Sequence, residues 1–410
     1  MKNIAIVGAG ASGLVCAITC ARAGLKVDVF EKHTKPARKI LASGNGRCNL
    51  LNKDTNICHF HSQNPSFVLP SISVFSFSKC LDFFCDIGIE VVEGEKGRLY
   101  PRSLCSSSVA ELLFYECKRL GVGFEFGCEV LHVQSANEKF ALHAEDKKLI
   151  FDAILIATGG MSMPSLGGSQ SGYEFAKKLG HNIIEIAPSL VQLESSDKTI
   201  KEASGVKVDA NIEIYVENSL HVSSRGDVLF ADYGVSGSAV LDVSRVASVA
   251  LQERKNVKAK IDIMPSFSKE ELRVLLQNRL KKTNKKSVSM WLDGLINKKL
   301  TSLVLENSSL SKNIFSSDEL TAKDMTKLAF GMKNIKIEIT GTKGFKSAEV
   351  TAGGVDTKEV DAKTMMSKKV QNLYFSGEVL DVDGDCGGYN LYWAWASGFV
   401  AGHSMAREKA

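Results

Sequence analysis

The first 31 residues constrain the fold of this chain more than any other segment. An apolar run at residues 4–7 leads directly into Gly8-Ala9-Gly10-Ala11-Ser12-Gly13, and a second apolar run at residues 27–30 ends on Glu31. A buried strand, a G-x-G-x-x-G turn, a helix over about residues 12–23 and a second strand ending on a carboxylate form the βαβ unit that binds the adenosine half of NAD or FAD. Glycine-rich turns alone are common, but here the strand, helix and acid are in register and favour the dinucleotide interpretation.

Each residue of this unit has a physical role in binding a dinucleotide. Gly8 permits the tight turn, Gly10 lets the backbone approach the pyrophosphate, and Gly13 lets the helix pack closely on the strand. The N–H groups of the first helical turn face the negative charge, and a terminal carboxylate accepts both ribose hydroxyls. The predicted cofactor contacts of this unit are Gly8, Gly10, Ala11, Ser12, Gly13, Glu31 and Lys32.

Length and charge limit the architecture and the partners. The 410 residues exceed what one hydrophobic core usually supports, which predicts two or three units. The net charge of +5 is modest, and the lysine-rich run at residues 279–286 lacks the interleaved aromatic residues of a nucleic-acid platform. We interpret this run as a solvated face or loop, with an acidic partner as the alternative. A small-molecule substrate is therefore expected rather than a nucleic acid.

The start of the chain and its cysteines predict the cellular compartment of the protein. Because a central strand begins at residue 4, a removable signal peptide has no room, and no run of roughly 18 apolar residues could span a bilayer. The ten cysteines stand at irregular spacings without a C-x-x-C pair, which favours reduced thiols over disulfides or a zinc site. The sequence thus predicts a cytoplasmic protein with neither a membrane span nor a metal site.

The segment after Glu31 favours FAD over NAD. A simple dehydrogenase would continue with alternating strands and helices, whereas residues 39–49 read K-I-L-A-S-G-N-G-R-C-N, which is too rich in Gly and Asn for a regular element. Small residues and backbone donors suit this segment to lie along an extended ligand, although a surface turn is the alternative. Its predicted cofactor contacts are Lys39, Ser43, Gly44, Gly46, Arg47, Cys48 and Asn49.

A second segment is typical of FAD proteins. Residues 151–156 form a predicted buried strand that ends in Ala157-Thr158-Gly159-Gly160, which resembles the crossover where the chain passes the cofactor. Predicted strands at residues 123–126, 129–133 and 139–144 form the antiparallel insert that precedes such a crossover. We therefore expect Thr158 and Gly159 to contact the cofactor and Val130 to lie near the adenine.

A third segment returns to the same site from the far end of the chain. A predicted strand at residues 372–376 ends in Gly377-Glu378, and a helix opens after a turn. An acid in this place holds a ribitol hydroxyl in many flavoproteins, and the helix N-terminus stabilises the negative charge of a reduced flavin near N1 and the C2 carbonyl. The predicted contacts are Gly377, Glu378, Gly387, Gly388, Tyr389, Asn390 and Leu391, and the apolar face of the helix, with Trp393 and Trp395, is expected in the core.

These segments together resemble the BaiN/RdsA/aminoacetone-oxidase-like family of FAD-dependent oxidoreductases. The resemblance rests on residues 39–49, on Arg98-Leu99-Tyr100-Pro101-Arg102-Ser103, on the A-T-G-G crossover and on residues 377–391, and it runs through the whole chain. More distantly, Gly353-Gly354-Val355 and the later S-G-E resemble the flavoprotein subunits of fumarate and succinate oxidoreductases. The substrate-binding His and Arg groups of those relatives have no evident match here, which disfavours a fumarate-type reaction.

The resemblance implies an α/β fold: a Rossmann-like FAD-binding domain, with a parallel sheet and an antiparallel crossover insert, interrupted by an inserted β-barrel that carries a helical subdomain and covers the flavin like a lid. Residues 206–262 are strand-like, and residues 268–332 switch to helical spacing, with Leu272, Leu275, Leu276 and Leu280 on one stripe. The expected division is residues 1–189 and 351–410 for the FAD domain, 190–267 and 333–350 for the barrel, and 268–332 for the helical subdomain.

The chemistry is less constrained than the cofactor. Gly168-Ser169-Gln170-Ser171-Gly172 has the wrong spacing for a second nucleotide turn, so NADH or NADPH is expected to bind only transiently, as the resemblance to reductases implies. Tyr100, Arg102 and Tyr389 are weak candidates for orienting a carbonyl or donating a proton, and Cys48 is a weaker one for thiol chemistry. Two hypotheses remain: hydride transfer through flavin N5 to a small substrate, by analogy an enone, or a flavoprotein that acts on RNA.

Overall fold

The computed structural model describes residues 2–136, 139–144, 147–282, 285–311 and 314–407. The chain divides into two compact units, the first formed by Met1–Ala187 with Glu349–Ala410 and the second by Pro188–Ala348. The first unit thus joins the two ends of the sequence, and the second is one continuous insertion into it.

The first unit is built on a five-stranded parallel sheet. Its spatial order is β21 (Leu373–Phe375), β11 (Ala153–Ile156), β1 (Asn3–Val7), β2 (Lys26–Glu31) and β7 (Gly123–Phe126). All residues of β11 and β21 are buried, as is expected where helices cover both faces of a parallel sheet. The Rossmann-like fold predicted from the glycine turn is confirmed.

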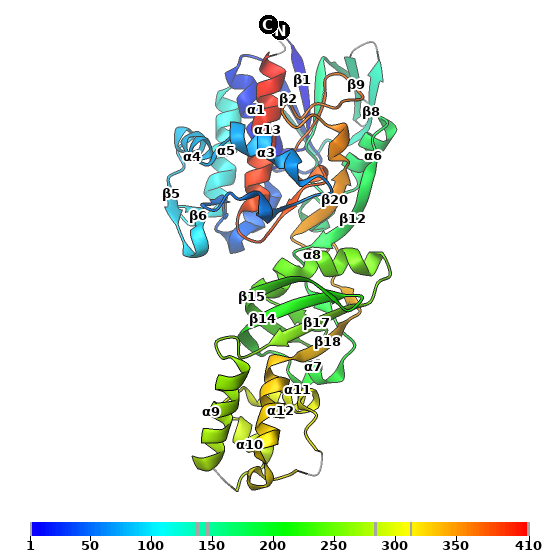
Figure 1. Cartoon of the computed structure of the whole chain (residues 1–410). Coiled ribbons are helices and arrows are strands. Elements are labelled where there is room, and N and C mark those ends of the chain that lie inside the picture. The colour runs from blue at the N-terminus through cyan, green and yellow to red at the C-terminus, as the bar shows by residue number, and fades with distance from the viewer. Residues whose placement is uncertain (1, 137–138, 145–146, 283–284, 312–313, 408–410) are drawn as a thin grey trace. The chain divides into compact units, whose positions relative to one another are not determined.

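Two helices from opposite ends of the chain pack on this sheet. Helix α1 (Ala11–Arg22) and helix α13 (Tyr389–Arg407) lie side by side, seen as the blue and red helices of Figure 1. A Cβ atom on Gly398 would stand 2.3 Å from the Ser12 carbonyl oxygen, so glycine is what lets the two helices touch. The Nε1 atoms of Trp393 and Trp395 donate to the Gly377 and Leu50 carbonyls, which confirms that this face of α13 lies in the core.

One strand assignment from the sequence is wrong. Strands β8 (Val130–Ala136), β9 (Lys139–Ala144) and β10 (Lys147–Phe151) form the expected antiparallel insert. Strand β7, predicted as part of that insert, pairs in parallel with β2 instead. It follows helix α5 (Ser106–Arg119), which packs on α1 and returns the chain to the edge of the parallel sheet.

The glycine-rich segment after β2 contains more regular structure than its composition indicates. Helix α2 (Arg38–Ala42) covers the Lys-Ile-Leu-Ala run, and a short 3₁₀ turn follows over Ser43–Gly46. Gly44 and Asn45 take left-handed backbone angles inside that turn. The prediction of an irregular segment over residues 39–49 is therefore wrong for residues 39–42, because the strong helix formers precede the first glycine.

Short strands bring other distant segments together in the first unit. Strand β4 (Phe60–His61) pairs antiparallel with β22 (Asp383–Gly384), directly before α13 begins. Strands β3 (Leu51–Asn52), β6 (Arg98–Pro101) and β5 (Val91–Glu93) form a further small sheet. These pairings hold the segment after the glycine-rich turn against the C-terminal turn.

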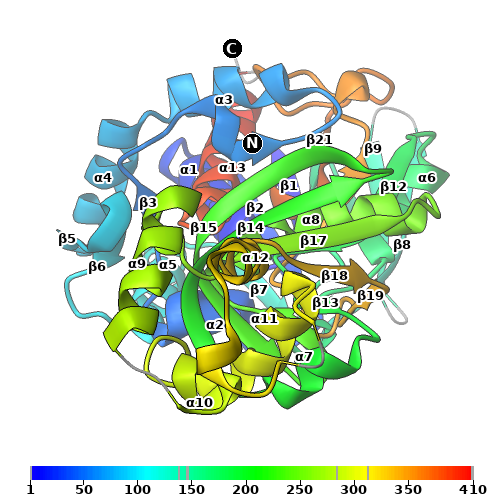
Figure 2. The ribbon, with the colours of Figure 1, turned by 60° about the horizontal axis from the view of Figure 1, so that its bottom comes forward.

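The second unit contains a seven-stranded sheet followed by helices. The sheet has the order β18 (Ile335–Ile339), β17 (Val257–Asp262), β14 (Lys207–Val216), β15 (Ser219–Ala231), β16 (Gly234–Ser236), β13 (Leu193–Glu194) and β19 (Gly341–Thr342). Its central strands lie side by side in Figure 2. The helices are α7 (Lys198–Glu202), α8 (Ser238–Gln252), α9 (Lys269–Lys282), α10 (Val288–Leu292), α11 (Thr301–Ser308) and α12 (Ala322–Lys333).

Sheet and helices of the second unit share one core. Buried residues of the strands, such as Ile212, belong to the same hydrophobic cluster as Leu276 of α9 and Trp291 of α10. In the lysine-rich run, Arg279 is not simply solvated, because its Nη2 atom donates to the Trp291 carbonyl at 2.8 Å, whereas Lys281 and Lys282 are exposed. Residues 283 and 284 of this run lie outside the described residues.

In the part of the chain that the structure describes, no single helix is long and apolar enough to cross a membrane. One pair of helices, Pro65–Val74 and Phe77–Asp86, passes that test jointly by length and composition, with a bend of 51° between them.

Candidate functional site

The glycine turn after β1 has the geometry of a dinucleotide site. A Cβ atom on Gly13 would stand 2.1 Å from the Gly8 carbonyl oxygen, so this glycine lets the helix pack on the turn. A Cβ atom on Gly10 would have no described atom within 4 Å, which leaves open space beside the backbone. Within the described residues no side chain caps the N-terminus of α1. Its first N–H groups, including those of Ala11 and Ser12, can therefore bind an anion.

Glu31, at the end of β2, closes the other side of this turn. Its Oε2 atom accepts from the Ala9 N–H at 2.9 Å, and its Oε1 atom accepts from the His33 N–H at 3.0 Å. The Glu31 carbonyl accepts from the Cys128 N–H, which brings the start of β8 and the buried Val130 to the same edge. Lys32, half-buried, follows Glu31 directly. These residues thus gather where the adenosine half of a dinucleotide would bind.

The A-T-G-G segment crosses directly beside the glycine turn. A Cβ atom on Gly8 would stand 2.5 Å from the Ala157 carbonyl oxygen and 3.2 Å from the Thr158 Cα atom. Gly159 has a positive φ of 72°, and no described atom lies within 4 Å of the place where its Cβ would be. The two turns therefore lie in contact, with open space at Gly10 and Gly159.

The segment Ser43–Asn49 has polar and open positions of the kind an extended ligand needs. The Oδ1 atom of Asn49 is buried and has no hydrogen-bond partner among the residues that the structure describes. A Cβ atom on Gly46 would also meet no described atom within 4 Å, while Gly44 packs against Asn49. The Ser43 hydroxyl donates to the Ile40 carbonyl, so this side chain closes α2 instead.

Two further residues of this segment have structural roles in the geometry. The Arg47 guanidinium lies 5.1 Å from the centre of the Tyr100 ring, which packs behind the glycines. Cys48 is fully buried, and burial raises the pKa of its thiol to about 12. A thiol with this pKa stays protonated near neutral pH, which removes Cys48 as a nucleophile.

Lys39 and Glu378 meet in one polar network. Lys39 Nζ lies 2.6 Å from Glu378 Oε2 and donates to the Ser162 hydroxyl at 2.5 Å. Glu378 Oε1 accepts from the Ser162 hydroxyl at 2.8 Å and from the Thr351 N–H at 2.9 Å. Gly377, before this acid, approaches the Ser12 side chain. Ser162 and Thr351 are functional candidates that the sequence analysis missed, because single serines and threonines carry no motif.

The turn before α13 is fixed by side chains. A Cβ atom on Gly388, at a φ of 103°, would stand 2.8 Å from the Leu51 backbone, so this glycine is required for packing on β3. Asn390 Oδ1 accepts from the Gly384 N–H at 2.8 Å, and its Nδ2 atom donates back to the Gly384 carbonyl. Asn52 Nδ2 donates to the Gly387 carbonyl at 3.1 Å. Leu391 is half-buried in the first turn of α13.

The residues present fit an FAD molecule. The open space at Gly10, Gly46 and Gly159 and the unpartnered buried Oδ1 of Asn49 are features that an extended phosphate-containing ligand would use. The Glu31 carboxylate lies at the end of β2 beside the glycine turn, and the N-terminus of α13 offers positive dipole character. Two of the three catalytic candidates are Tyr100 and Arg102. Tyr100 packs behind Gly44 and Gly94, and Arg102 lies on an exposed turn.

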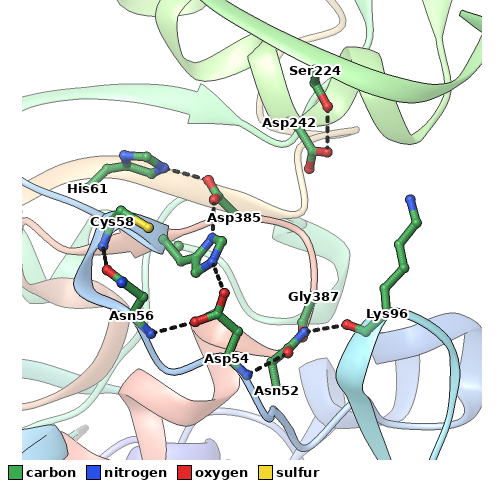
Figure 3. A network of polar contacts seen from close by, with 12 residues as sticks. Asn52, Asp54, Asn56, Cys58, His61, Lys96, Ser224, Asp242, Asp385 and Gly387 are labelled. Atoms are coloured by element: carbon green, nitrogen blue, oxygen red, sulfur yellow. Dashed lines mark hydrogen bonds and ion pairs between the residues drawn. The ribbon is translucent and has the colours of Figure 1, made fainter. Parts of the chain in front are cut away.

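The third candidate, Tyr389, belongs to a cluster that the sequence analysis missed. Its ring stacks on His59 with 4.3 Å between the ring centres. His59 Nδ1 lies 2.9 Å from Asp385 Oδ2, and His59 Nε2 lies 3.1 Å from Asp54 Oδ2. The other oxygen of Asp385 lies 2.6 Å from His61 Nε2, as Figure 3 shows. One carboxylate is thus shared by two histidines.

Opposing effects set the charges of this cluster. Burial lowers the pKa of His59, but the hydrogen bonds to Asp385 and Asp54 outweigh it and leave that pKa raised. Burial raises the pKa of Asp385, but the hydrogen bonds to His61 and His59 outweigh it and leave that pKa lowered. Burial also raises the pKa of Tyr389 to about 12. Among the described residues, no group of His, Cys, Asp or Glu is arranged to hold a metal ion.

The H-F-H sequence at residues 59–61 puts two histidines close together in the chain, but the two do not share a strand. His59 ends a 3₁₀ turn, Ile57–His59, and His61 lies on β4. Their partner Asp385 stands in the D-x-D-G-D run near the other end of the chain. The pairing of β4 with β22 brings the two runs together, and the Asp385 N–H adds a bond to the His59 carbonyl.

Comparison with known proteins gives close relatives over the whole length. The HI0933-like protein Rossmann domain matches residues 2–404. The chain is 35% identical to a 3-dehydro-bile acid delta(4,6)-reductase of Clostridium scindens, over 100% of both chains. It is 33% identical to a ribosomal RNA dihydrouridine synthase of Haemophilus influenzae, over 99% of both chains.

Solved structures support the fold. A 3-ketosteroid delta1-dehydrogenase from Sterolibacterium denitrificans superposes with a TM-score of 0.51 at 9% identity over 100% of both chains. A 3-ketosteroid-delta4-(5alpha)-dehydrogenase from Rhodococcus jostii gives 0.50 at 13% identity, over 99% of this chain and 97% of that one. The chain therefore belongs to the HI0933-like Rossmann family, and it is an enzyme of the FAD-dependent oxidoreductase class.

Proposed function

We propose that this enzyme reduces a carbon–carbon double bond that is conjugated to a carbonyl group. The observation that supports this proposal is the full-length similarity to two relatives whose names both describe the reduction of such a double bond. A 3-dehydro-bile acid with delta(4,6) unsaturation is a conjugated dienone, and dihydrouridine is uridine whose ring double bond, conjugated to a carbonyl, has been reduced. When bound, FAD supplies the hydride for such a reduction through N5.

In this proposal the chain's own residues hold the cofactor in five places. Glu31 binds the adenosine ribose, and the first turn of α1 with Gly10 binds the pyrophosphate. Asn49 and Gly46 line the extended part of the cofactor. Thr158 and Gly159 contact the cofactor at the A-T-G-G crossover. The N-terminus of α13, opened by Gly387 and Gly388, stabilises negative charge on the flavin ring.

NADH or NADPH is proposed as the electron donor that binds transiently. The spacing of the glycines at residues 167–172 does not match a second nucleotide turn. A donor that docks over the flavin needs no Rossmann domain of its own. Anaerobic mixing with each nucleotide, followed by bleaching of the flavin absorbance, identifies the donor.

A small enone is the first substrate class that we propose, and RNA is the second candidate. The higher identity of the bile-acid reductase favours the small substrate, and two rRNA dihydrouridine synthases at 33% and 32% identity favour the second. Exposed Lys281 and Lys282 on α9 offer phosphate contacts, but among the described residues of that run no aromatic side chain accompanies them.

The test compares the two substrate classes under identical conditions. The purified enzyme with its donor is incubated anaerobically with 3-oxochola-4,6-dienoic acid or with ribosomal RNA that lacks dihydrouridine. Mass spectrometry is expected to show a gain of two hydrogens in the steroid acid. Reduction confined to the RNA, with binding that weakens steeply as salt rises, would select the second candidate. Reduction of neither compound would contradict the proposed function.

A further inference from the structure

Reduction of a conjugated double bond needs a proton as well as a hydride. The β carbon of the substrate accepts the hydride with its electron pair, the double bond becomes single, and the α carbon accepts a proton. A general acid beside the reacting atoms supplies that proton and contributes about 10²- to 10⁴-fold in rate. Two of the three residues predicted for this role are poorly placed, since Tyr100 packs behind the glycines and Arg102 lies on an exposed turn. The third, Tyr389, lies in the histidine cluster, where its ring stacks on His59 and burial raises its pKa to about 12.

We propose, resting on the proposed function, that His61 is this proton donor and that Asp385 and His59 are its positioning residues. His61 ends β4, and Asp385 directly follows the partner strand β22, in the turn before α13. This places His61 beside the helix N-terminus that we assign to the flavin ring. The imidazolium of His61 gives its proton to the substrate and regains one from solvent after each turnover.

The two histidines differ in what their nitrogens can do. Both ring nitrogens of His59 contact carboxylates, Asp385 at 2.9 Å and Asp54 at 3.1 Å. His61 uses only Nε2, at 2.6 Å from Asp385, and among the described residues its Nδ1 atom has no partner. The side chain of His61 is also 34% exposed against 25% for His59. His61 is therefore the histidine with a nitrogen free to reach a substrate.

Asp385 orients His61 in the way a carboxylate orients a catalytic imidazole. A carboxylate on one ring nitrogen fixes the tautomer and the ring plane, so that the other nitrogen faces the substrate. The second oxygen of Asp385 is held by His59, which in turn stacks on Tyr389 at the start of α13. The backbone of the same turn adds a bond, because the Asp385 N–H donates to the His59 carbonyl.

The charged groups around the cluster keep a histidine cation favourable. Asp54 and Cys58 face it from the segment before β4, and Asp385 faces it from the turn before α13. Arg98 of β6 opposes them, with its guanidinium 3.8 Å from the Cys386 sulfur. Two carboxylates against one guanidinium leave the surroundings net negative, which agrees with the raised pKa of His59.

The experiment separates the proton step from hydride supply. His61→Gln keeps a hydrogen-bond donor for Asp385 but cannot protonate a carbon. The matched control is His132→Gln, because His132 is an exposed histidine on β8 that contacts Lys178. Each purified protein is reduced with dithionite, so that the identity of the natural donor is irrelevant. Anaerobic mixing with 3-oxochola-4,6-dienoic acid then gives the rate of flavin reoxidation as a function of pH.

We expect wild type and His132→Gln to share one profile whose rate falls as pH rises, since the acid must be protonated. His61→Gln is expected to bind as much FAD, to be reduced equally by dithionite, and to reoxidise about 100- to 10,000-fold more slowly without that alkaline decline. Histidine ¹⁵N NMR gives a readout that does not depend on activity. We expect the Nε2–H tautomer of His61 in the wild type, and we expect Asp385→Asn to lose the preference for that tautomer.

Two outcomes overturn the proposal in distinguishable ways. If wild-type protein is reoxidised and His61→Gln matches it in rate and pH profile, His61 is not the proton donor while the proposed function stands. If the reduced wild-type protein is reoxidised neither by the enone nor by ribosomal RNA that lacks dihydrouridine, the proposed function fails and this role of His61 fails with it. A His61 tautomer that is unchanged in Asp385→Asn overturns the positioning role of Asp385.

Discussion

Lys39 Nζ lies 2.6 Å from Glu378 Oε2, although 339 residues separate the two in sequence. The contact joins the segment after the first nucleotide strand to the end of the last one. It shows how the two ends of the chain form one side of the candidate site within the first unit. Ser162 bridges both side chains, so the A-T-G-G crossover belongs to the same network.

This contact predicts a measurable coupling between Lys39 and Glu378. The side chains are 35% and 18% exposed, which reduces the interaction by solvent screening. In urea unfolding of Lys39→Met, Glu378→Gln and the double variant, we expect a coupling free energy of about 1 kcal/mol. Losses that simply add would show that the pair does not contribute to stability.

Alanine substitutions of Gly10 and Gly13 are expected to have different effects, one on FAD affinity and the other on stability. Gly10→Ala adds a Cβ atom to open space at an ordinary φ of −83°, so stability is retained while FAD affinity falls at least about tenfold. Gly13→Ala places a Cβ atom 2.1 Å from the Gly8 carbonyl oxygen and is expected to cost about 1–3 kcal/mol of stability. FAD titration and thermal unfolding of both proteins distinguish the two effects, and full FAD affinity in Gly10→Ala would refute the assignment of this space to the pyrophosphate.

Glu31 is expected to determine affinity for the adenosine half of FAD. Glu31→Gln removes the charged acceptor, which corresponds to about 1.5–3 kcal/mol of binding free energy, or roughly 10- to 150-fold in Kd. Glu125→Gln, at the exposed end of the adjacent β7, is the matched control because its carboxylate contacts only Lys147 among the described residues. Equal Kd values for the two variants, from flavin fluorescence titration, would contradict the ribose assignment.

The histidine cluster predicts a stability that depends on pH. The raised pKa of His59 contributes stability below the ordinary histidine pKa, and this contribution is lost as pH rises through the raised value. The lowered pKa of Asp385 contributes stability above the ordinary Asp pKa, and this contribution is lost as pH falls through the lowered value. Both contributions are present between these limits, in weakly acidic solution.

Asp385→Asn should therefore lower the melting temperature more in weakly acidic than in alkaline solution. Asp209→Asn, which removes an exposed partner of Arg225, serves as the control and should show no such trend. Thermal unfolding across this pH range gives both differences. A constant difference for Asp385→Asn would mean that His59 does not depend on this carboxylate.

We expect the first unit to fold without the inserted residues 190–349. Strands β12 (Ile183–Ser189) and β20 (Val350–Val355) pair, and the Asp356 N–H donates to the Asn182 carbonyl while Gly353 lies against Glu185. This antiparallel order brings residues 189 and 350 together, so a short Gly-Asn turn can replace residues 190–349. The shortened protein should fold and bind FAD but lose enone reduction. A shortened protein with the parent's substrate kinetics would show that the insertion has another purpose.

The cofactor fold was predictable because its signals are local. Glycine spacing, a buried strand and a terminal acid stand within one βαβ unit, and physical constraints on each position restrict the residue type. The same reasoning failed for β7, because a strand's partner depends on the helix before it, and for α2, whose helix formers adjoin glycines. The His59, His61 and Asp385 cluster was not predictable from spacing, since Asp385 lies far from the two histidines in the sequence and meets them through tertiary contacts such as the β4–β22 pairing.

The central claim is tested most directly by a single anaerobic turnover of the purified, dithionite-reduced protein with 3-oxochola-4,6-dienoic acid. We expect that the protein carries FAD rather than FMN, that the oxidised flavin spectrum returns, and that one double bond is reduced for each flavin reoxidised. A flavin that stays reduced in the presence of the enone, or a reoxidation without change in the mass of the steroid, would contradict it.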